Sequence, residues 1–260
     1  MGEKRYALRD DQWERMKDLL PGREGSVGVT AKNNRLFVEA VLYRYCAGIP
    51  WRDLPWRFGD FRVIHTRHMR WSKKGVWKKV FEHLADDVDN DYAALDSTIV
   101  RAHQDAAGAK RGDKETECIG RSKGGLSTKI HATCDALGNP TGFHLTAGQA
   151  HDLNGADELL PPLLNSINAF LADKAYDAGE RVLNLLAKAN VKIVIPPTAN
   201  RKEQRDYDKE LYKFRHLIEN FFQKLKQYRA IATRYDKRAT AFLGAIHLAA
   251  AVIWLSGYLA

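Results

Sequence analysis

The chain has 260 residues, 45% of them apolar, which is enough for one large domain or two smaller ones with a buried core. A formal net charge of +9 favours a polyanionic partner, nucleic acid before anionic membrane, although an ordinary basic enzyme has the same balance. The three cysteines form no C-x-x-C pair, which argues against a disulfide framework. The N-terminus also lacks an apolar signal core, so we expect a cytoplasmic protein.

The first part of the chain is basic and its patterns are helical. Residues 1–85 hold 18 Lys and Arg against 10 Asp and Glu, together with five of the six tryptophans. Asp10 is placed to cap a helix that runs to Leu20. Residues 32–46 carry an apolar stripe with helical spacing, and Gly48 follows as a stop signal. We therefore expect a small all-α domain over residues 1–88.

One further helix in this region is strongly basic. Asp60 is placed to cap it and Gly75 to end it. Short helices, sharp turns and this basic helix predict a helix-turn-helix-like DNA-binding domain, while a small bundle with a solvated basic face remains equally open. The cations that we expect to contact DNA are Arg67, Arg70, Lys73 and Lys74.

The pattern changes after an acidic cluster at residues 86–91, which we interpret as a linker. Three strand-like segments follow in succession and then helices alternate with strands, which predicts an α/β domain over residues 89–260 with a mixed sheet and helices on its faces. The turn Asp135–Pro140 predicts a hairpin. The strands are expected at residues 92–100, 129–134, 141–146, 170–172 and 192–195, and the helices at residues 155–164, 179–189 and 208–229.

Two segments allow more than one interpretation. Residues 102–128 are polar and rich in Gly, Lys and Arg, so they form either a flexible loop or a segment that wraps a DNA backbone through Arg121 and Lys123. Residues 239–260 contain no charged side chain and are long enough to span a bilayer. Their Ala and Gly content and the charged region before them favour a helix buried in a globular core, so no membrane is expected.

Three carboxylates are candidates for one metal site. Asp96 lies in an apolar strand, where an acid is costly unless it is paired or bound to metal. Asp173 follows a short apolar run, at a strand end where α/β proteins build their sites. Carboxylate oxygens suit Mg²⁺ or Mn²⁺, and such a cluster can hold two ions. His131 and His151 are too scattered for a zinc site, so we expect structural roles for them.

The third carboxylate, Glu219, is expected on the helix over residues 208–229. In a continuous helix Tyr212, Arg215, Glu219 and Lys226 fall within about 60° of one another. By itself this pattern favours a salt-bridged solvent face, helped by the Arg215–Glu219 spacing. Together with two strand-borne aspartates, it predicts that Glu219 binds metal and that the cations contact phosphate.

These residues also resemble a known family. The spacing Tyr212-x2-Arg215-x3-Glu219-x6-Lys226 matches the Y-x2-R-x3-E-x6-K signature of bacterial insertion-sequence DDE transposases, at every position. The segments ALDSTIVRAH around Asp96 and LADKAYD around Asp173 resemble the family's first two aspartate motifs. The segments GGLSTKIHA and GIPWRDLP are similar as well, and the resemblance covers about residues 6–255.

The resemblance implies an RNase H-like catalytic domain in which Asp96, Asp173 and Glu219 are the catalytic and metal-binding triad. Tyr212, Arg215 and Lys226 would support the triad or touch DNA. It further implies Mg²⁺, with Mn²⁺ as a substitute, double-stranded terminal inverted repeats and target DNA as partners, a homodimer or higher assembly on DNA, and a nucleoid-associated location. A catalytically silent DNA-binding protein and an RNase H-like nuclease are the rival interpretations.

Overall fold

The computed structural model describes residues 5–23, 30–85, 87–107, 117–202 and 204–257. The chain forms two compact units, one containing residues 1–86 and 224–260 and the other residues 87–102 and 113–223, with the described part of residues 103–112 in the first. The C-terminal segment thus belongs with the N-terminal helices, whereas the sequence assigned residues 89–260 to one domain. The boundary between the units, after residue 86, falls within the acidic cluster at residues 86–91.

The first unit is helical, as predicted. Asp60 caps α3 by accepting a hydrogen bond from the Arg62 N–H at 2.8 Å, and Gly48 ends α2 in the left-handed conformation with φ of 72°. A tight turn through Gly75 joins α3 to α4. The elements are α1 (Asp10–Met16), α2 (Asn34–Ala47), α3 (Phe61–Lys73), α4 (Val76–Leu84), α9 (Arg229–Ala232), β7 (Thr233–Arg234) and α10 (Ala239–Gly257).

One prediction for the first helix is wrong. Asp10 is the first helical residue rather than the cap, because Arg9 occupies the cap position and its N–H binds the Gln12 side chain at 3.1 Å. The α-helix ends at Met16, and a short 3₁₀ turn, Lys17–Leu19, completes the segment that was expected to run to Leu20.

Helix α10 is the one helix in the described part of the chain that is long and apolar enough to cross a membrane. Most of its side chains are buried, and it packs against α3 and α4. Gly244 lies so close to α3 that a Cβ there would stand 2.4 Å from the Ser72 hydroxyl. Close packing of this kind is what the sequence led us to expect of a core helix rather than a membrane span.

A buried polar network lies beside α10 within the same unit. The Tyr45 hydroxyl donates to Asp236 at 2.9 Å and lies 3.2 Å from His68 Nε2, while Trp77 Nε1 donates to His68 Nδ1 at 3.2 Å. Burial lowers the pKa of His68 to about 4, so its ring is neutral. Arg44 faces Asp236 at 3.4 Å, and both side chains are almost fully buried. These side chains tie α2, α3 and α4 to the segment before α10.

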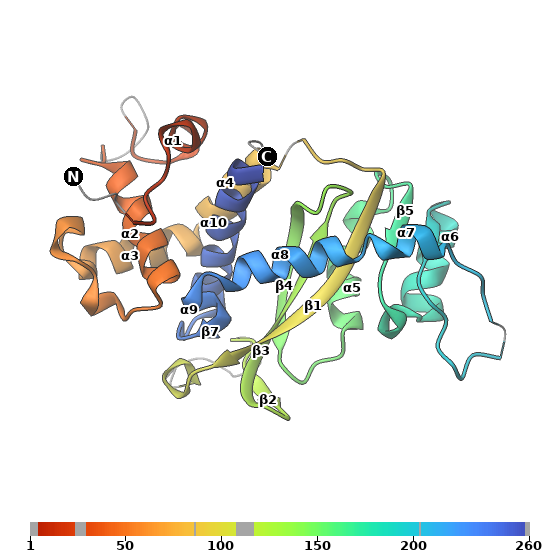
Figure 1. Ribbon diagram of the computed structural model, residues 1–260. Coiled ribbons are helices and arrows are strands. Elements are labelled where there is room, and N and C mark those ends of the chain that lie inside the picture. Colours follow the sequence, from red (N-terminus) through yellow and green to blue (C-terminus); the bar gives the residue numbers. More distant parts are fainter. Residues whose placement is uncertain (1–4, 24–29, 86, 108–116, 203, 258–260) are drawn as a thin grey trace. The chain divides into compact units, whose positions relative to one another are not determined.

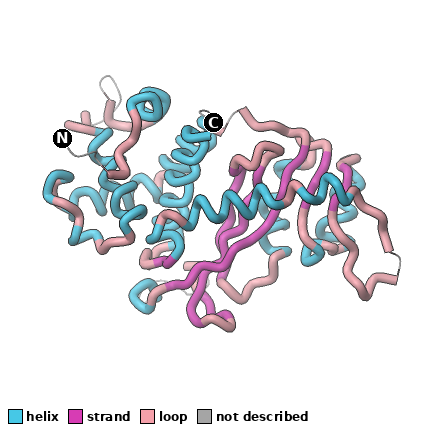
Figure 2. Tube along the Cα trace, in the orientation of Figure 1, coloured by secondary structure: helices cyan, strands magenta, loops and turns pink. Residues whose placement is uncertain are grey.

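The second unit is built on a mixed sheet (Figures 1 and 2). Strand β3 pairs antiparallel with β1 on one side and with β4 and the short β2 on the other, while β5 and β6 run parallel to β1. This is the RNase H-like order. The strands are β1 (Tyr92–Ala102), β2 (Gly120–Ser122), β3 (Gly125–Cys134), β4 (Pro140–Ala147), β5 (Ala169–Leu171) and β6 (Lys192–Val194).

Helices cover both faces of the sheet. Ala93, Leu95 and Phe170 bury one face under α5 (Leu153–Leu159) and α6 (Asn184–Lys188), where a π-helical turn, Gly179–Leu183, leads into α6. The opposite face meets α8 (His216–Lys226), where the Phe221 ring lies 5.8 Å from the Phe143 ring of β4.

Two predictions in this unit need correction. Residues 102–128 are not one structureless loop, because β2 and the start of β3 form a hairpin within them, while residues 108–116 lie outside the described part. The helix expected over residues 208–229 is two helices, α7 (Lys209–Lys213) and α8. The turn between them is held by short-range bonds, from the Arg215 N–H to the Tyr212 carbonyl at 3.1 Å and from the Leu217 N–H to the Phe214 carbonyl at 3.0 Å.

Acid should weaken this unit through His131, which lies on β3. Burial lowers the pKa of His131 to about 4 from 6.5. The unfolded chain therefore binds more protons between these values, so the stability due to neutral His131 is present above pH 6.5 and is lost as the pH falls towards 4. Replacing His131 by Leu should flatten the fall of the thermal midpoint in that range, as followed by circular dichroism. Burial raises the pKa values of Asp96 and Asp135, so these two groups favour the folded unit as the pH falls. They do so equally in the wild type and in the His131 variant. An unchanged slope in the variant would refute this assignment.

Candidate active site

Two aspartates lie level with each other on neighbouring parallel strands. Ala94 of β1 pairs with Leu171 of β5. Asp96 lies two residues after Ala94, and Asp173 lies two residues after Leu171. Since side chains alternate along a strand, both carboxylates point to the same face of the sheet. Burial raises the pKa of Asp96, and the nearby charge of Asp173 raises it further, against the opposing effect of a 2.7 Å hydrogen bond from the Ser97 N–H. The predicted pair of acids is therefore brought together.

Asp173 also shapes the chain that follows it. Its Oδ1 accepts the Ala175 N–H at 2.9 Å, which caps the 3₁₀ turn Lys174–Tyr176. The apolar strand Ala169–Leu171 is fully buried and ends just before this turn. One carboxylate oxygen is thus engaged with the backbone, which fixes the side chain at the strand end.

An ion cluster around the buried carboxylate of Asp177, which was not predicted from the sequence, holds the same turn. Asp177 accepts the Thr198 N–H at 2.8 Å, Arg201 Nε at 2.9 Å and Arg205 Nη2 at 3.2 Å. Burial alone would raise the pKa of Asp177, but these hydrogen bonds and charges hold it below its usual range. The segment after β6 is therefore fastened to the turn that carries Asp173. The signal in the sequence was an acid four residues past Asp173 with two arginines downstream.

Arg215 links the third predicted carboxylate to the first. Its Nη1 donates to Asp96 Oδ2 at 2.7 Å, and its Nη2 donates to Glu219 Oε1 one helical turn along α8. The side chains of Arg215 and Asp96 are 18% and 19% exposed, whereas that of Glu219 is 51% exposed. Burial would lower the pKa of Arg215, but the charges of Asp96 and Glu219 outweigh it and raise it. The guanidinium therefore stands between the two carboxylates.

The other two residues of the signature lie on the helices before and after Arg215 in the chain. Tyr212 is on α7, where burial raises the pKa of its phenol, the charge of Asp173 adds to the rise and that of Arg215 opposes it. The phenol is therefore within electrostatic reach of both groups. Lys226 is exposed in the last turn of α8. Because the helix breaks before α8, Tyr212 does not share a continuous helical face with Glu219 and Lys226 as the sequence predicted.

The donor chemistry suits a hard divalent cation, but the arrangement does not yet present three ligands to one. Carboxylate oxygens are what Mg²⁺ prefers, and Asp96 and Asp173 stand side by side. Within the described residues, however, no three acidic, His or Cys side chains converge closely enough to hold an ion. The Glu219 carboxylate is held through Arg215 instead of joining the aspartates directly.

A second polar network lies on the opposite face of the sheet. The hydroxyl of Ser97, next to Asp96, donates to Asp152 at 2.6 Å, and Lys129 donates to Asp152 at 2.9 Å and to the Ala150 carbonyl at 2.6 Å. His131 lies on the same face and its Nε2 pairs with the Thr146 hydroxyl at 2.9 Å. The bond from Ser97 to Asp152 ties β1, next to Asp96, to the segment that precedes α5.

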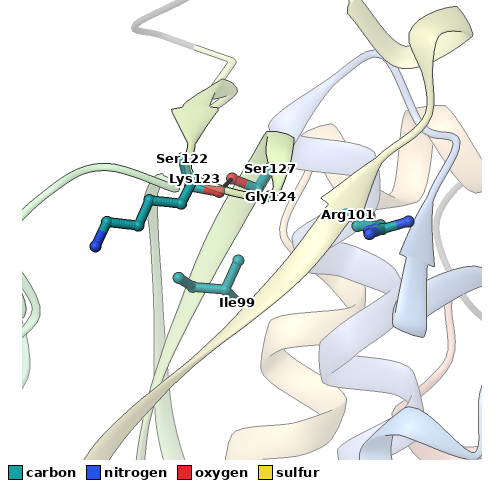
Figure 3. Close-up of a pocket in the computed structure, with 6 residues that line it drawn as sticks. All are labelled: Ile99, Arg101, Ser122, Lys123, Gly124 and Ser127. Carbon is teal, nitrogen blue, oxygen red and sulfur yellow. Dashed lines mark hydrogen bonds between the residues drawn. The ribbon is translucent and has the colours of Figure 1, made fainter.

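A cavity of about 450 Å³ opens near the far end of β1, beside the β2–β3 hairpin. Figure 3 shows Ile99 on its floor, with the side chains of Lys123 and Arg101 leaving in opposite directions. The Ser127 hydroxyl donates to that of Ser122 at 2.8 Å and braces the hairpin. Lys123, which the sequence predicted to contact DNA, therefore lines a pocket, and Arg121 is exposed on the same hairpin.

The cations of α3 differ in their surroundings. Arg70, Lys73 and Lys74 are exposed. Arg67 is half-buried, with its guanidinium 4.2 Å from the centre of the Phe37 ring and 4.5 Å from that of Trp71, and it donates to Asn34. Burial lowers its pKa. Arg67 thus packs within the unit, and the exposed three form the basic surface of α3.

Comparison with known proteins identifies the family. Residues 8–81 match "Putative transposase of IS4/5 family" and residues 89–254 match "Transposase DDE domain". The chain is 43% identical over 132 residues to the "Putative transposase for insertion sequence element IS6501" of Brucella ovis, which covers 50% of this chain and 99% of that protein. It is 47% identical over 104 residues to "Uncharacterized protein y4sN" of Sinorhizobium fredii, covering 40% of this chain and 83% of that protein.

Among solved structures, the pre-cleavage Mos1 transpososome aligns at 12% identity over 94% of this chain and 85% of that chain, with a TM-score of 0.28. The sequence matches are decisive, because the DDE domain covers more than half of the chain and the Brucella relative is covered almost completely. The chain therefore belongs to the DDE transposases of bacterial insertion sequences.

Proposed function

We propose that this transposase binds the terminal inverted repeats of its own element, cleaves DNA there and joins the freed end to target DNA, with Asp96, Asp173 and Glu219 as its catalytic carboxylates. The observation that carries the proposal is the register of β1 and β5, which puts Asp96 and Asp173 side by side, with Glu219 joined to Asp96 through Arg215. DDE transposases depend on divalent metal, and we propose Mg²⁺, which Mn²⁺ can replace.

A bound divalent cation would supply charge that activates the attacking hydroxyl and stabilises the leaving oxygen at phosphorus. The chain's own residues position the reactants. Asp173 caps the turn that follows it by accepting the Ala175 N–H, and the Asp177 cluster ties that turn to the segment after β6. We expect Tyr212, Arg215 and Lys226 to contact the DNA backbone, as one phenol and two cations.

We propose that the helical unit, residues 1–88 in outline, recognises the ends of the element through the basic surface of α3. Replacing Arg70 and Lys73 by Gln should weaken binding of an end duplex and lower the slope of log affinity against log salt by about 2, roughly one for each phosphate contact. Fluorescence anisotropy over a salt series measures both. Lys78→Gln is the control, because Lys78 faces Glu82 on α4. An unchanged slope in the double variant would rule out α3 as the DNA-binding surface.

We propose that one DNA strand crosses the pocket of Figure 3, because two cations flank an apolar floor there and each can contact a phosphate. Replacing Lys123 and Arg101 by Gln should lower the same salt slope by about 2. Lys188→Gln removes an exposed charge from α6 in the same unit and should leave the slope unchanged. Equal slopes for the wild type and the pocket variant would exclude this path for the strand.

The function is tested with a linear DNA that carries both ends of the element and its flanks, incubated with the protein and Mg²⁺. We expect cuts at the element boundaries and, with added plasmid, joined products. We propose that a dimer or larger assembly on DNA forms these products and that, in the cell, it acts on the DNA of the nucleoid in the cytoplasm. Cuts without position preference would indicate the RNase H-like nuclease. Binding of the ends without any cut would indicate the catalytically silent DNA-binding protein.

A further inference from the structure

The guanidinium of Arg215 occupies the space between two members of the proposed triad. It donates from Nη1 to Asp96 at 2.7 Å and from Nη2 to Glu219, so both terminal nitrogens are engaged. The planar guanidinium carries several N–H donors in a fixed geometry and can therefore bind two acceptors at once. The single positive charge of Arg215 thus bridges Asp96 and Glu219, the two carboxylates that we expect a metal ion to bring together.

Electrostatics explains why the guanidinium is stable there. Asp96 is mostly buried and stands next to Asp173 on the neighbouring strand, so two negative charges face each other in a partly desolvated place. An acid in such a place requires a counter-charge. Arg215 supplies it from the turn between α7 and α8, and no metal is needed to satisfy Asp96.

The ion pairs of Arg215 with the two carboxylates can also be broken. The bond to Glu219 joins a carboxylate that is half-exposed, where water competes and an ion pair contributes little. Arg215 sits at the break between two helices, and its long side chain can rotate without unwinding α8. The bond to the more buried Asp96 therefore holds the Arg215 guanidinium in place, and a divalent cation beside Asp96 would repel that guanidinium.

We propose that Arg215 is an exchangeable counter-ion that couples metal binding to DNA binding. In one state its guanidinium neutralises Asp96 and Glu219; in the other it turns to a DNA phosphate and leaves these carboxylates to the metal. This inference rests on the proposed function of the triad. The metal and the DNA both favour the state in which Arg215 has left the two carboxylates. DNA must therefore tighten metal binding, and metal must tighten DNA binding, by the same factor. The chain would then bind metal weakly until it holds DNA.

The test uses Mn²⁺ alone with the full-length protein, and free Mn²⁺ is counted by electron paramagnetic resonance. Arg215→Gln should bind Mn²⁺ at least roughly fivefold more tightly than the wild type, the lower end of typical coupling between sites. Arg215→Lys keeps the charge but cannot bridge two carboxylates in the same geometry. Its affinity for Mn²⁺ should therefore lie between those of the wild type and Arg215→Gln. Lys213→Gln is the matched control, because it removes a charge two residues away that pairs with Glu210.

A second arm measures the affinity for an end duplex by anisotropy, in Ca²⁺ and in EDTA. The wild type should bind DNA more tightly in Ca²⁺, and Arg215→Gln should lose that difference. Asp173→Asn separates the two claims. If Mn²⁺ binding depends on Asp173 but is not tighter in either Arg215 variant, the exchange of Arg215 is overturned while the metal-binding triad stands. If no protein, including Arg215→Gln, binds Mn²⁺ in a manner that depends on Asp173, the metal-binding triad itself is overturned.

Discussion

Replacing Asp96 by Asn is expected to slow strand cleavage by roughly three orders of magnitude or more, while binding of the end duplex stays within a few-fold of wild type. The substitution keeps the shape of the side chain but removes the charge that we assign to the metal. Stabilisation by a bound metal amounts to several kcal/mol of the barrier, and each 1.4 kcal/mol is tenfold in rate. Single-turnover cleavage of a labelled end, with anisotropy on the same DNA, measures both quantities.

The control removes an acid of the same unit that lies outside the site. Asp157→Asn breaks an exposed ion pair with Arg181 and should cleave at the wild-type rate. Cleavage by Asp96→Asn at the rate of Asp157→Asn would refute the catalytic assignment. A parallel loss of DNA binding in EDTA, where no metal contributes, would instead show that Asp96 organises the fold.

The second large effect concerns stability. Replacing Asp236 by Ala is expected to destabilise the helical unit by about 3–5 kcal/mol, because it leaves Arg44 buried without its counter-charge. Arg44 and Asp236 are 3% and 7% exposed, and Tyr45 loses its acceptor in the same change. Urea unfolding followed by tryptophan fluorescence reports on this unit, since all six tryptophans belong to it.

Asp11→Ala is the matched control, because Asp11 pairs with Arg9 on the surface of the same unit and its loss should leave the urea midpoint unchanged. Replacing Arg44 and Asp236 together by Met and Leu removes both charges and should recover much of the lost stability. Equal midpoints for Asp236→Ala and the wild type would show that water reaches Arg44 and that the network contributes little.

The sequence predicted what depends on local pattern. Alternating apolar residues located β1, β3 and β4, the turn at Asp135 located their hairpin, and Asp60 located the start of α3. Asp96 could be assigned to a strand and Asp173 to a strand end, and the family signature predicted Glu219 as the third carboxylate. That the two aspartates are neighbours depends on the parallel register of β1 and β5, which is a long-range property that no local pattern contains.

The remaining features depend on tertiary contacts. A continuous helix over residues 208–229 agrees with every local propensity, yet the chain breaks it at Arg215, whose side chain reaches Asp96 across 119 residues of sequence. Helix α10 looked like part of the catalytic domain because it follows it in the chain, but its apolar side chains are buried against α3 and α4. Asp177 was passed over because a buried acid is recognisable only from the arginines that fold onto it.

We propose that this chain cuts DNA at the ends of its own element with a divalent metal held by Asp96, Asp173 and Glu219. The most direct measurement incubates the wild-type protein with DNA that spans one end and its flank, with Mg²⁺ in one sample and EDTA in the other, and maps the 3′ ends formed. The account predicts a cut at the element boundary with Mg²⁺ and none with EDTA. Cleavage that persists in EDTA, or that falls at random along the DNA, would contradict it.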